Sequence, residues 1–508
     1  MIDIEDVSFK YGSEERECLK SIDLHISKGE CVLLCGRSGC GKTTVTKLVN
    51  GLIPHFDEGE LRGKVTVAGM DVAGTEMYRL SQKVGSVFQN PKTQFFNIDS
   101  DSEIAFGLEN QGMEPGRIRE RIDETVRQLR VEGILGRNLF EMSGGERQLL
   151  AFASVHAIDP DVYVLDEPSA NLDRDAIDQL RECLMTIKRQ GKTVLIAEHR
   201  LYYLMDIIDK AAYMDCGEVR RVFSRDELLA LPMGERKEMG LRTRTAPRTR
   251  EDVVGDDPGT PCRPDLEVQG LCCKFKKRTV LGDVSLSASG GDVIGVLGEN
   301  GAGKTTLMRC LAGLLKERGG RICIGGERMK PRQRTEQHYM IMQDVGHQLF
   351  AESVWDECLL SDDEAPEEAV ENVLKEASLL EFRDSHPMTL SGGQKQRLAI
   401  ATGVLSDKKV LIFDEPTSGL DYFNMLRVSD IIKRLAGEGR IVFVVTHDME
   451  FLEATCSRGI IMDKGAIVKQ SLLAIPHGPC GPPAVPRDAC AAPFPGRNEP
   501  AQAGPVRE

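Results

Sequence analysis

The chain lacks any apolar run long enough to cross a membrane. Its longest uninterrupted runs, such as Ile441 to Val445, have the length of a β-strand, whereas a membrane-spanning helix needs about 20 apolar residues. The first residues, Met1-Ile2-Asp3-Ile4-Glu5, are acidic and alternating, without the basic and apolar regions of a secretion signal. We therefore expect the chain to stay in the cytoplasm.

The chain also lacks an excess of basic residues and clustered metal-binding cysteines. Lys plus Arg number 65 against 79 Asp plus Glu, which gives a net charge of -14 and disfavours attraction to phosphate backbones. The 15 cysteines contain no C-x-x-C pair, and the adjacent Cys272 and Cys273 do not form a zinc-ligand pattern. Neither nucleic acid nor a cysteine-bound metal is therefore expected.

What the sequence does contain is one unit written twice. Gly36-Arg37-Ser38-Gly39-Cys40-Gly41-Lys42-Thr43-Thr44 recurs as Gly298-Glu299-Asn300-Gly301-Ala302-Gly303-Lys304-Thr305-Thr306, Ser143-Gly144-Gly145 recurs as Ser391-Gly392-Gly393, and Asp166-Glu167-Pro168 recurs as Asp414-Glu415-Pro416. From the Ser-Gly-Gly serine to the aspartate is 23 residues in both copies, and from the aspartate to a histidine is 33. Chance matching does not produce equal spacings, so a tandem duplication is indicated.

The duplication divides the chain into four parts. We expect domains at 1–235 and 264–475, a flexible linker at 236–263 that contains Arg242, Arg244, Arg248 and Arg250 without apolar periodicity, and a disordered tail at 476–508. The last 34 residues hold nine of the 23 prolines. Such a composition does not provide enough apolar surface for a core.

Each copy alternates strands with helices. Three apolar segments in each copy predict buried strands: Cys31–Cys35, Val162–Leu165 and Thr193–Ala197 in the first, and Val293–Leu297, Val410–Phe413 and Ile441–Val445 in the second. The first of these strands precedes a Gly-rich turn, the second two carboxylates, and the third a histidine. This order predicts an α/β fold with a mostly parallel sheet and with ligands at the carboxyl ends of its strands.

The repeated G-x-x-x-x-G-K-T segment is suited to a nucleotide triphosphate. Its glycines allow backbone N–H groups to surround phosphates, and Lys42 and Lys304 would reach the β and γ oxygens. Residues 36–44 and 298–306 are therefore predicted to bind ATP. Thr43 and Thr305 would offer a hydroxyl to Mg²⁺.

The acidic pairs complete this chemistry. Asp166 and Asp414 are placed to hold Mg²⁺ through water, and Glu167 and Glu415 to orient and deprotonate the attacking water. An isolated acidic pair at a strand end is often only a solvated turn. After a phosphate-binding loop, hydrolysis is the favoured interpretation.

Ser143-Gly144-Gly145-Glu146 and Ser391-Gly392-Gly393-Gln394 each precede a helical run and offer further anion-binding N–H groups. With these segments both halves resemble the ATP-binding-cassette (ABC) ATPases, whose signature is L-S-G-G-Q. The resemblance implies an antiparallel β subdomain and a helical signature subdomain beside each core. In the first copy Met142 replaces the signature Leu and Glu146 its Gln, which places a carboxylate near an anion site.

The resemblance also implies roles for single residues. Gln89 and Gln343 match the Q-loop glutamine that senses Mg²⁺, Asp173 and Asp421 the D-loop, and His199 and His447 the switch histidine that touches the γ-phosphate. Tyr11 and Phe275 stand where the family stacks an aromatic ring on adenine. An ordinary packed aromatic remains the alternative for both.

A narrower resemblance is to the ATPases of energy-coupling factor (ECF) transporters. The segments concerned are Asn50-Gly51-Leu52-Ile53-Pro54-His55-Phe56, Val87-Phe88-Gln89-Asn90-Pro91-Lys92-Thr93-Gln94-Phe95-Phe96, Phe106-Gly107-Leu108-Glu109-Asn110 and Ala197-Glu198-His199-Arg200-Leu201. This resemblance implies a peripheral ATPase on the cytoplasmic face of the membrane. Its partners would be a shared transmembrane coupling protein and a membrane component that binds the substrate, a vitamin or a transition-metal ion.

Two alternatives remain at this point. One is a soluble twin-cassette ATPase that acts on ribosomes or RNA, although such proteins carry a long, charged helical linker that this chain lacks. The other is a twin-cassette sugar importer, in which one copy commonly lacks the catalytic carboxylate. Both Glu167 and Glu415 are present, which favours two active sites.

We further predict that the halves complete each other's sites head to tail. Lys42, Gln89, Asp166, Glu167 and His199 would work with 391–394, and Lys304, Gln343, Asp414, Glu415 and His447 with 143–146. A γ-phosphate needs positive potential on its open side, which a second helix N-terminus supplies. The apolar pairs Phe95-Phe96 and Leu349-Phe350, just past the Q-loops, are predicted to receive the membrane partner, with core packing as the alternative.

Overall fold

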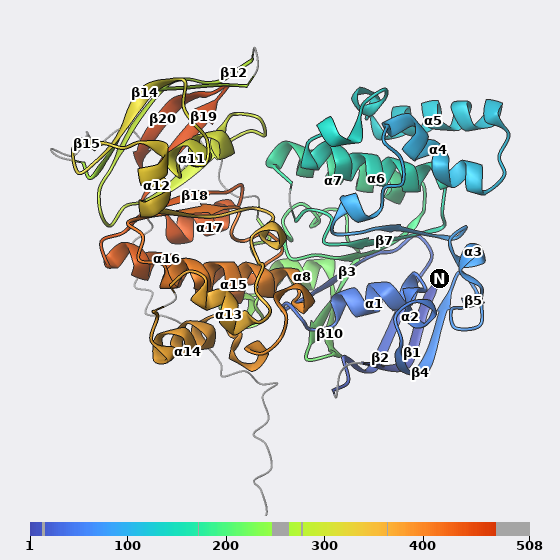
Figure 1. Cartoon of the computed structure of the whole chain (residues 1–508). Coiled ribbons are helices and arrows are strands. Elements are labelled where there is room, and N and C mark those ends of the chain that lie inside the picture. The colour runs from blue at the N-terminus through green and yellow to red at the C-terminus, as the bar shows by residue number, and fades with distance from the viewer. Residues whose placement is uncertain (13–15, 171, 246–263, 276–277, 363, 474–508) are drawn as a thin grey trace, which may run out of the picture. The chain divides into compact units, whose positions relative to one another are not determined.

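The computed structural model describes residues 1–12, 16–170, 172–245, 264–275, 278–362 and 364–473. These residues belong to one contact unit, Met1–Ile475, and Figure 1 follows them from the first cassette, blue to green, to the second cassette, yellow-green to red. In the part of the chain described, no helix is both long and apolar enough to cross a membrane.

The first cassette contains two sheets and nine helices among its described residues. Its strands are β1 (Ile2–Tyr11), β2 (Leu19–Ile26), β3 (Cys31–Gly36), β4 (Gly59–Val67), β5 (Met70–Asp71), β6 (Val84–Val87), β7 (Val162–Asp166), β8 (Thr193–Ala197), β9 (Lys210–Asp215) and β10 (Glu218–Ser224). Its helices are α1 (Lys42–Val49), α2 (Leu52–His55), α3 (Met77–Leu80), α4 (Ser100–Asn110), α5 (Pro115–Leu129), α6 (Gly144–Ile158), α7 (Arg174–Arg189), α8 (Arg225–Ala230) and α9 (Met233–Glu238).

The second cassette repeats the order of the strands, with seven α-helices among its described residues. Its strands are β11 (Leu266–Phe275), β12 (Arg278–Ala288), β13 (Val293–Gly298), β14 (Gly319–Ile324), β15 (Glu327–Arg328), β16 (His338–Ile341), β17 (Val410–Asp414), β18 (Ile441–Val445), β19 (Arg458–Asp463) and β20 (Ala466–Leu472). Its helices are α11 (Lys304–Leu311), α12 (Pro331–Gln337), α13 (Val354–Leu359), α14 (Glu367–Glu376), α15 (Gly392–Leu405), α16 (Tyr422–Gly437) and α17 (Met449–Thr455).

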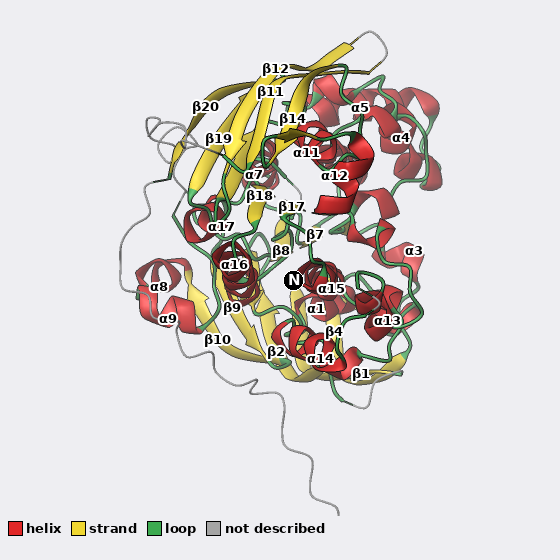
Figure 2. Cartoon of the chain, turned by 60° about the vertical axis from the view of Figure 1, so that its left-hand side comes forward, coloured by secondary structure: helices red, strands yellow, loops and turns green. Residues whose placement is uncertain are grey.

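Both cassettes have the same sheet topology. The antiparallel sheets run β2-β1-β4-β5 and β12-β11-β14-β15, and the larger sheets run β6-β7-β8-β3-β9-β10 and β16-β17-β18-β13-β19-β20. In each larger sheet only the last pair, β9 with β10 or β19 with β20, is antiparallel. Figure 2 shows the strands in yellow and the helices in red. The predicted class, two mostly parallel cores each with an antiparallel subdomain, is confirmed.

The central strands are apolar at nearly every position because both of their faces are covered. In β3, Cys31, Leu33 and Cys35 face one hydrophobic cluster, whereas Val32 and Leu34 face another. Successive side chains of a strand point to opposite sides of the sheet, so a strand between two layers has no polar face. The six strands predicted from the sequence all form, because their uniform apolar runs need burial on both sides.

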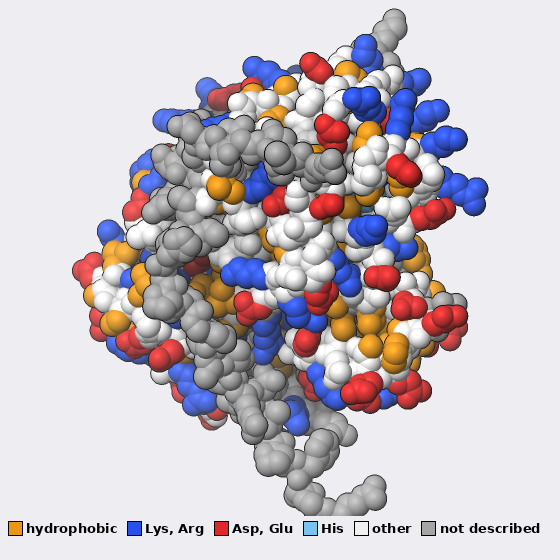
Figure 3. All heavy atoms as spheres, turned by 90° about the vertical axis from the view of Figure 1, so that its left-hand side faces the viewer, with side chains coloured by type: hydrophobic (Ala, Val, Ile, Leu, Met, Phe, Trp, Pro, Cys, Tyr) orange, Lys and Arg blue, Asp and Glu red, His pale blue; other side chains and the backbone are white. Residues whose placement is uncertain are grey.

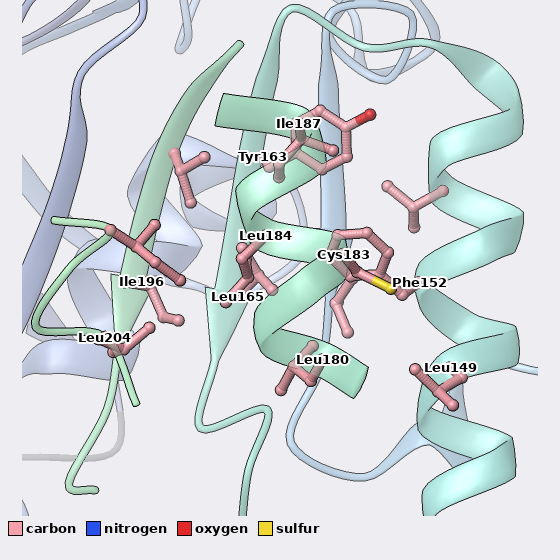
Figure 4. Packing of buried hydrophobic residues seen from close by; sticks show 14 of the residues in the cluster. Leu149, Phe152, Tyr163, Leu165, Leu180, Cys183, Leu184, Ile187, Ile196 and Leu204 are labelled. Carbon is pink, nitrogen blue, oxygen red and sulfur yellow. The ribbon is translucent and has the colours of Figure 1, made fainter. Parts of the chain in front are cut away.

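The helical layer against the first core sheet uses α6 and α7. Figure 4 shows Leu149 and Phe152 of α6 and Leu180, Cys183 and other residues of α7 packed against β7. Polar residues begin at the carboxyl end of β7, with Asp166 and Glu167. This packing fixes the carboxyl ends of β3, β7 and β8, the edge at which the candidate site residues lie.

Residues 236–245 differ from the predicted flexible linker. Helix α9 extends to Glu238, and the side chains of Arg236 and Arg242 are buried. Arg242 pairs with Asp448 and, at 2.9 Å, with Glu450 of the second cassette. The lack of apolar periodicity suggested a flexible segment, but buried ion pairs, together with the buried Leu241, hold it against the cassettes. Residues 246–263 and the predicted tail, 476–508, lie outside the described residues.

Two candidate nucleotide sites

The first Gly-rich loop joins β3 to α1 in a conformation that only glycine adopts easily. Gly36, Gly39 and Gly41 have φ values of 146°, 76° and 99°, in the region that disfavours side chains. A Cβ on Gly36 would lie 2.1 Å from the carbonyl oxygen of Met214. The glycines therefore allow the backbone to curve closely around an anion, as a phosphate-binding loop requires.

Lys42 lies inside this loop and is buried. Its Nζ donates to the carbonyl oxygens of Gly36 at 3.2 Å and Arg37 at 2.9 Å. Thr43 at the start of α1 donates its hydroxyl to Oδ1 of Asp166 at 3.2 Å. This pair brings together a hydroxyl and a carboxylate oxygen, the ligand type that Mg²⁺ prefers, so the residues present fit a Mg²⁺-bound nucleotide.

Glu167 lies at the centre of the first site. Gln89 donates from Nε2 to one of its carboxylate oxygens at 2.7 Å, and Nε2 of His199 lies 3.3 Å from the other. Burial raises the pKa of Glu167, but His199 and Lys42 outweigh it and hold the pKa below its ordinary value. Burial and the neighbouring Glu167 raise the pKa of Asp166 to about 6. The arrangement keeps one carboxylate charged beside the buried lysine.

The second site repeats the loop and its lysine. Gly298, Gly301 and Gly303 have φ values of 151°, 84° and 100°. Nζ of Lys304 donates to the carbonyl oxygens of Gly298 at 2.7 Å and Glu299 at 2.9 Å, and lies 3.3 Å from Nε2 of His447. The last contact links lysine and switch histidine directly.

The carboxylates of the second site make different polar contacts from those of the first, since Glu415 accepts from the hydroxyl of Thr446 and from the backbone N–H of His447, both at 3.4 Å. Thr305 donates to Asp414 at 3.1 Å, and Oε1 of Glu415 lies 3.6 Å from Nε2 of His447. Burial, and then the charge of Asp414, raise the pKa of Glu415 to about 7. These residues and Gln343 line a pocket of about 610 Å³. The structure thus assembles the predicted lysine, threonine, acidic pair, glutamine and histidine around one cavity.

Both signature serines cap a helix. Ser143 precedes α6 and Ser391 precedes α15, and each forms a reciprocal capping box with the residue three positions on. Glu146, the departure noted in the sequence, is bonded to the Ser143 N–H at 2.7 Å and is ion-paired with Arg137. Its negative charge is therefore compensated locally. Gly144, Gly145, Gly392 and Gly393 form the first turns of these helices.

Tyr11 and Phe275 are the aromatic residues predicted to stack on adenine. Tyr11 ends β1, its hydroxyl lies 3.4 Å from that of Thr44, and Nζ of Lys47 lies 5.6 Å from the ring centroid. The ring is therefore beside the helix that follows the first loop, and its role at adenine stays a prediction. Phe275 ends β11, and its side chain lies outside the described residues.

Contacts between the cassettes involve residues that the sequence patterns do not pair. Oδ2 of Asp421, the N-cap of α16, accepts from the backbone N–H of Ser38 at 2.6 Å, which links the second D-loop to the first phosphate loop. Ser418 donates to the carbonyl of Ala170 at 2.7 Å. Arg200 of the first cassette lines the second pocket. Residues 143–146 are not among the described residues that line that pocket.

Comparison with known proteins decides the family. The ABC transporter family model matches residues 19–170 and 281–418, which include both phosphate loops and both acidic pairs. The chain belongs to the ABC transporter family. It is an ATP-binding subunit with two ABC cassettes, as the repeated motifs indicated.

Relatives match along nearly the whole length. An ABC transporter ATP-binding protein of Treponema denticola is 48% identical over 473 residues, covering 92% of this chain and 97% of the relative. One from Streptomyces coelicolor is 32% identical over 525 residues, covering 92% and 93%. Among solved structures, one titled RNase-L Inhibitor has a TM-score of 0.61 at 20% identity, covering 92% of this chain and 90% of its own. That likeness shows the twin-cassette fold.

Proposed function

We propose that the chain hydrolyses Mg²⁺-ATP at two sites and thereby energises a membrane importer of the energy-coupling factor type. The observation that carries hydrolysis is the complete residue set in each cassette. Lysine, a threonine–aspartate pair, and a glutamate with a histidine within 3.6 Å occur at the strand ends of both. A site that only bound nucleotide would not need the second carboxylate.

Each residue has a separable role in this proposal. Lys42 and Lys304 bind the β and γ phosphates, and Thr43 with Asp166 and Thr305 with Asp414 hold Mg²⁺, with Gln89 and Gln343 beside the ion. Glu167 and Glu415 accept the proton of the attacking water. His199 and His447 orient these glutamates and contact the γ-phosphate. Mg²⁺ would neutralise charge on the phosphate oxygens.

The sites are proposed to be composite. The Asp421 bond to Ser38 and the Ser418 bond to Ala170 support this, because the second D-loop touches the first phosphate loop and the loops after the two acidic pairs touch each other. In the proposal, Ser391–Gln394 complete the first site and Ser143–Glu146 the second, each with the N-terminal end of a capped helix aimed at the γ-phosphate.

The ECF assignment is supported by the segments around Pro54, Gln89, Phe106 and His199 that resemble such ATPases. The proposed partners are a transmembrane coupling protein and a substrate-binding membrane component for a vitamin or a transition-metal ion, with the chain on the cytoplasmic face. Acidic and basic side chains are interspersed on the face shown in Figure 3, and the net charge is -14, so a nucleic-acid function is not favoured.

In each apolar pair predicted to receive the membrane partner, one residue is exposed and the other packs into the protein. Phe96 and Phe350 are 75% and 77% exposed, whereas Phe95 packs against the core and Leu349 is buried. At each exposed phenylalanine, a buried glutamate accepts a hydrogen bond from the backbone N–H. Glu103 accepts from the backbone N–H of Phe96 at 3.0 Å, and Glu357 from that of Phe350 at 2.8 Å.

The proposal is tested by purifying the chain from native membranes with mild detergent. Copurification of hydrophobic membrane subunits, and ATPase activity that depends on Glu167 and Glu415, are expected. Sedimentation with ribosomes at physiological salt, without membrane subunits, would instead support the soluble twin-cassette alternative. Reconstitution with the copurified subunits then identifies the substrate by uptake.

A further inference from the structure

The two cassettes differ directly after the switch histidine. His199 is followed by Arg200, whereas His447 is followed by Asp448. The preceding spacings are equal, so the two residues occupy equivalent positions of the repeat. A basic residue in one copy and an acidic residue in the other give the two sites different electrostatic surroundings.

Asp448 bonds to residues of its own cassette and to the segment that joins the cassettes. Its side chain is buried and ion-paired with Arg242. It also accepts from the hydroxyl of Thr417 at 3.0 Å and from the N–H of Phe451 at 3.1 Å as the N-cap of α17. All these bonds serve packing, and the paired arginine neutralises the carboxylate.

Arg200 instead bonds to its own cassette and lines the nucleotide pocket of the other. Its Nη1 donates to the carbonyl oxygens of Ser169 and Leu172, both at 3.2 Å, in the loop that leads to the D-loop. The same side chain lines the pocket formed by Lys304, Glu415 and the rest of the second site. Its positive charge lowers the pKa of Glu415, against the larger opposite effects of burial and Asp414.

We propose that Arg200 supplies a positive charge in trans to the γ-phosphate of ATP at the second site. This inference rests on the proposed function. The second pocket is lined by two carboxylates, Asp414 and Glu415, and by Lys304, Lys464 and Arg278 of the same cassette, and Arg200 is the cation that the first cassette adds. Each further positive charge favours the entry of a triphosphate beside the two carboxylates. A guanidinium presents several donors in a fixed fork that matches phosphate oxygens. The equivalent residue at the first site is Asp448, so this contribution is made at one site only.

Because the charge faces the γ-phosphate, it discriminates ATP from ADP. The full chain is prepared with Lys42→Ala, which leaves the second site to bind nucleotide, and separately with Lys304→Ala, which leaves the first. Equilibrium binding of ATPγS and of ADP, both with Mg²⁺, is then measured with and without changes at Arg200. In the Lys42→Ala chain, Arg200→Ala is expected to weaken ATPγS binding about tenfold and ADP binding less than about twofold.

Two further variants separate charge from hydrogen bonding. Arg200→Gln retains a donor for the carbonyls of Ser169 and Leu172 but no charge, and is expected to behave like Arg200→Ala. Arg200→Lys retains the charge and is expected to recover most of the ATPγS affinity. Arg220→Ala removes an exposed arginine of β10 that pairs with Glu218, and serves as the matched control for loss of one positive charge.

Three results would overturn the inference. These are recovery of ATPγS binding by Arg200→Gln, equal weakening of ATPγS and ADP binding, or equal weakening in the Lys42→Ala and Lys304→Ala chains. Each would show that Arg200 only positions the loop around Leu172. A Lys42→Ala chain that binds no ATPγS with Arg200 intact would overturn the second nucleotide site itself, and the inference with it.

Discussion

The first and second nucleotide sites carry the same residue types at the same spacings but make different contacts. Glu167 is held from both sides by Gln89 at 2.7 Å and His199 at 3.3 Å. Glu415 has His447 at 3.6 Å, and that histidine also contacts Lys304 at 3.3 Å. A repeated motif therefore fixes which groups are present at each site, whereas residues from the other cassette and from the connecting segment determine their surroundings.

The largest expected effect concerns the ion pair that anchors the connecting segment. Arg242→Ala leaves Asp448 buried without its cation and should lower the free energy of unfolding by about 3–5 kcal/mol. Arg137→Ala removes a half-exposed pair with Glu146 in the first cassette and should cost less than about 1 kcal/mol. Denaturant titration of both variants measures the contrast, and equal losses would show that residues 236–245 contribute no more than a surface pair.

Next in size is the loss of either glutamate that we propose as the catalytic base. Glu167→Gln and Glu415→Gln keep the shape of the side chain but remove the base, and each should reduce hydrolysis at its own site by about a hundredfold or more. Steady-state ATPase assays of the two single variants and the double variant give the comparison. Unchanged activity in Glu415→Gln, with activity abolished in Glu167→Gln, would mean that the second site is regulatory.

A buried histidine in each cassette predicts a smaller, pH-dependent effect. Burial lowers the pKa of His156 and of His338 to about 4, below the ordinary value of 6.5. The unfolded chain therefore takes up the proton first as the pH falls, so stability decreases from about pH 6.5 towards pH 4. Each histidine should cost about 2 kcal/mol between pH 7 and pH 5.

This histidine effect is measured by urea unfolding at several pH values. His156→Gln and His338→Gln should each flatten the pH dependence by the same amount, although either variant has its own packing cost at pH 7. His25→Gln changes an exposed histidine and is the control. A pH profile that neither variant alters would show that other groups dominate acid unfolding.

The smallest effect on stability is expected at Phe96 and Phe350, the exposed aromatic residues just past the Q-loops. Their loss should strongly reduce the coupling of ATP hydrolysis to transport. Phe350→Ser removes a side chain that is mostly in solvent, so the free energy of unfolding should change by less than about 0.5 kcal/mol. Phe96→Ser also removes a ring stacked on Phe106 and should cost about 1 kcal/mol. Transport by the reconstituted complex should fall while ATP binding stays. Loss of folding in both variants would favour core packing instead, and loss of transport in only one would show that the cassettes dock unequally.

Much of the fold follows from local patterns. The strands ending at Gly36, Asp166 and Ala197 are apolar except for Thr193 and the terminal Asp166, and the glycines, caps and carboxylates beside them act within a few residues of their own positions. The duplicated topology follows because the second copy repeats these signals. These features can be predicted without knowing which distant residues lie beside them in the fold.

The features that the sequence did not predict depend on residues far apart in the chain. Arg200 is separated by more than two hundred residues from Glu415, and Arg242 by a similar distance from Asp448. A charged residue without apolar periodicity is usually solvated, so neither arginine stands out in the sequence. The burial of Arg242 depends on Asp448 and Glu450, and the position of Arg200 beside the second pocket depends on the assembled cassettes.

The central claim, that each nucleotide is completed by both cassettes, is tested most directly by counting bound nucleotides in two double variants. Lys42→Ala with Ser391→Arg should damage one shared site and leave about one ATPγS per chain, whereas Lys42→Ala with Ser143→Arg should damage both sites and leave almost none. Equal residual binding in the two variants, under conditions without hydrolysis, would contradict the head-to-tail arrangement.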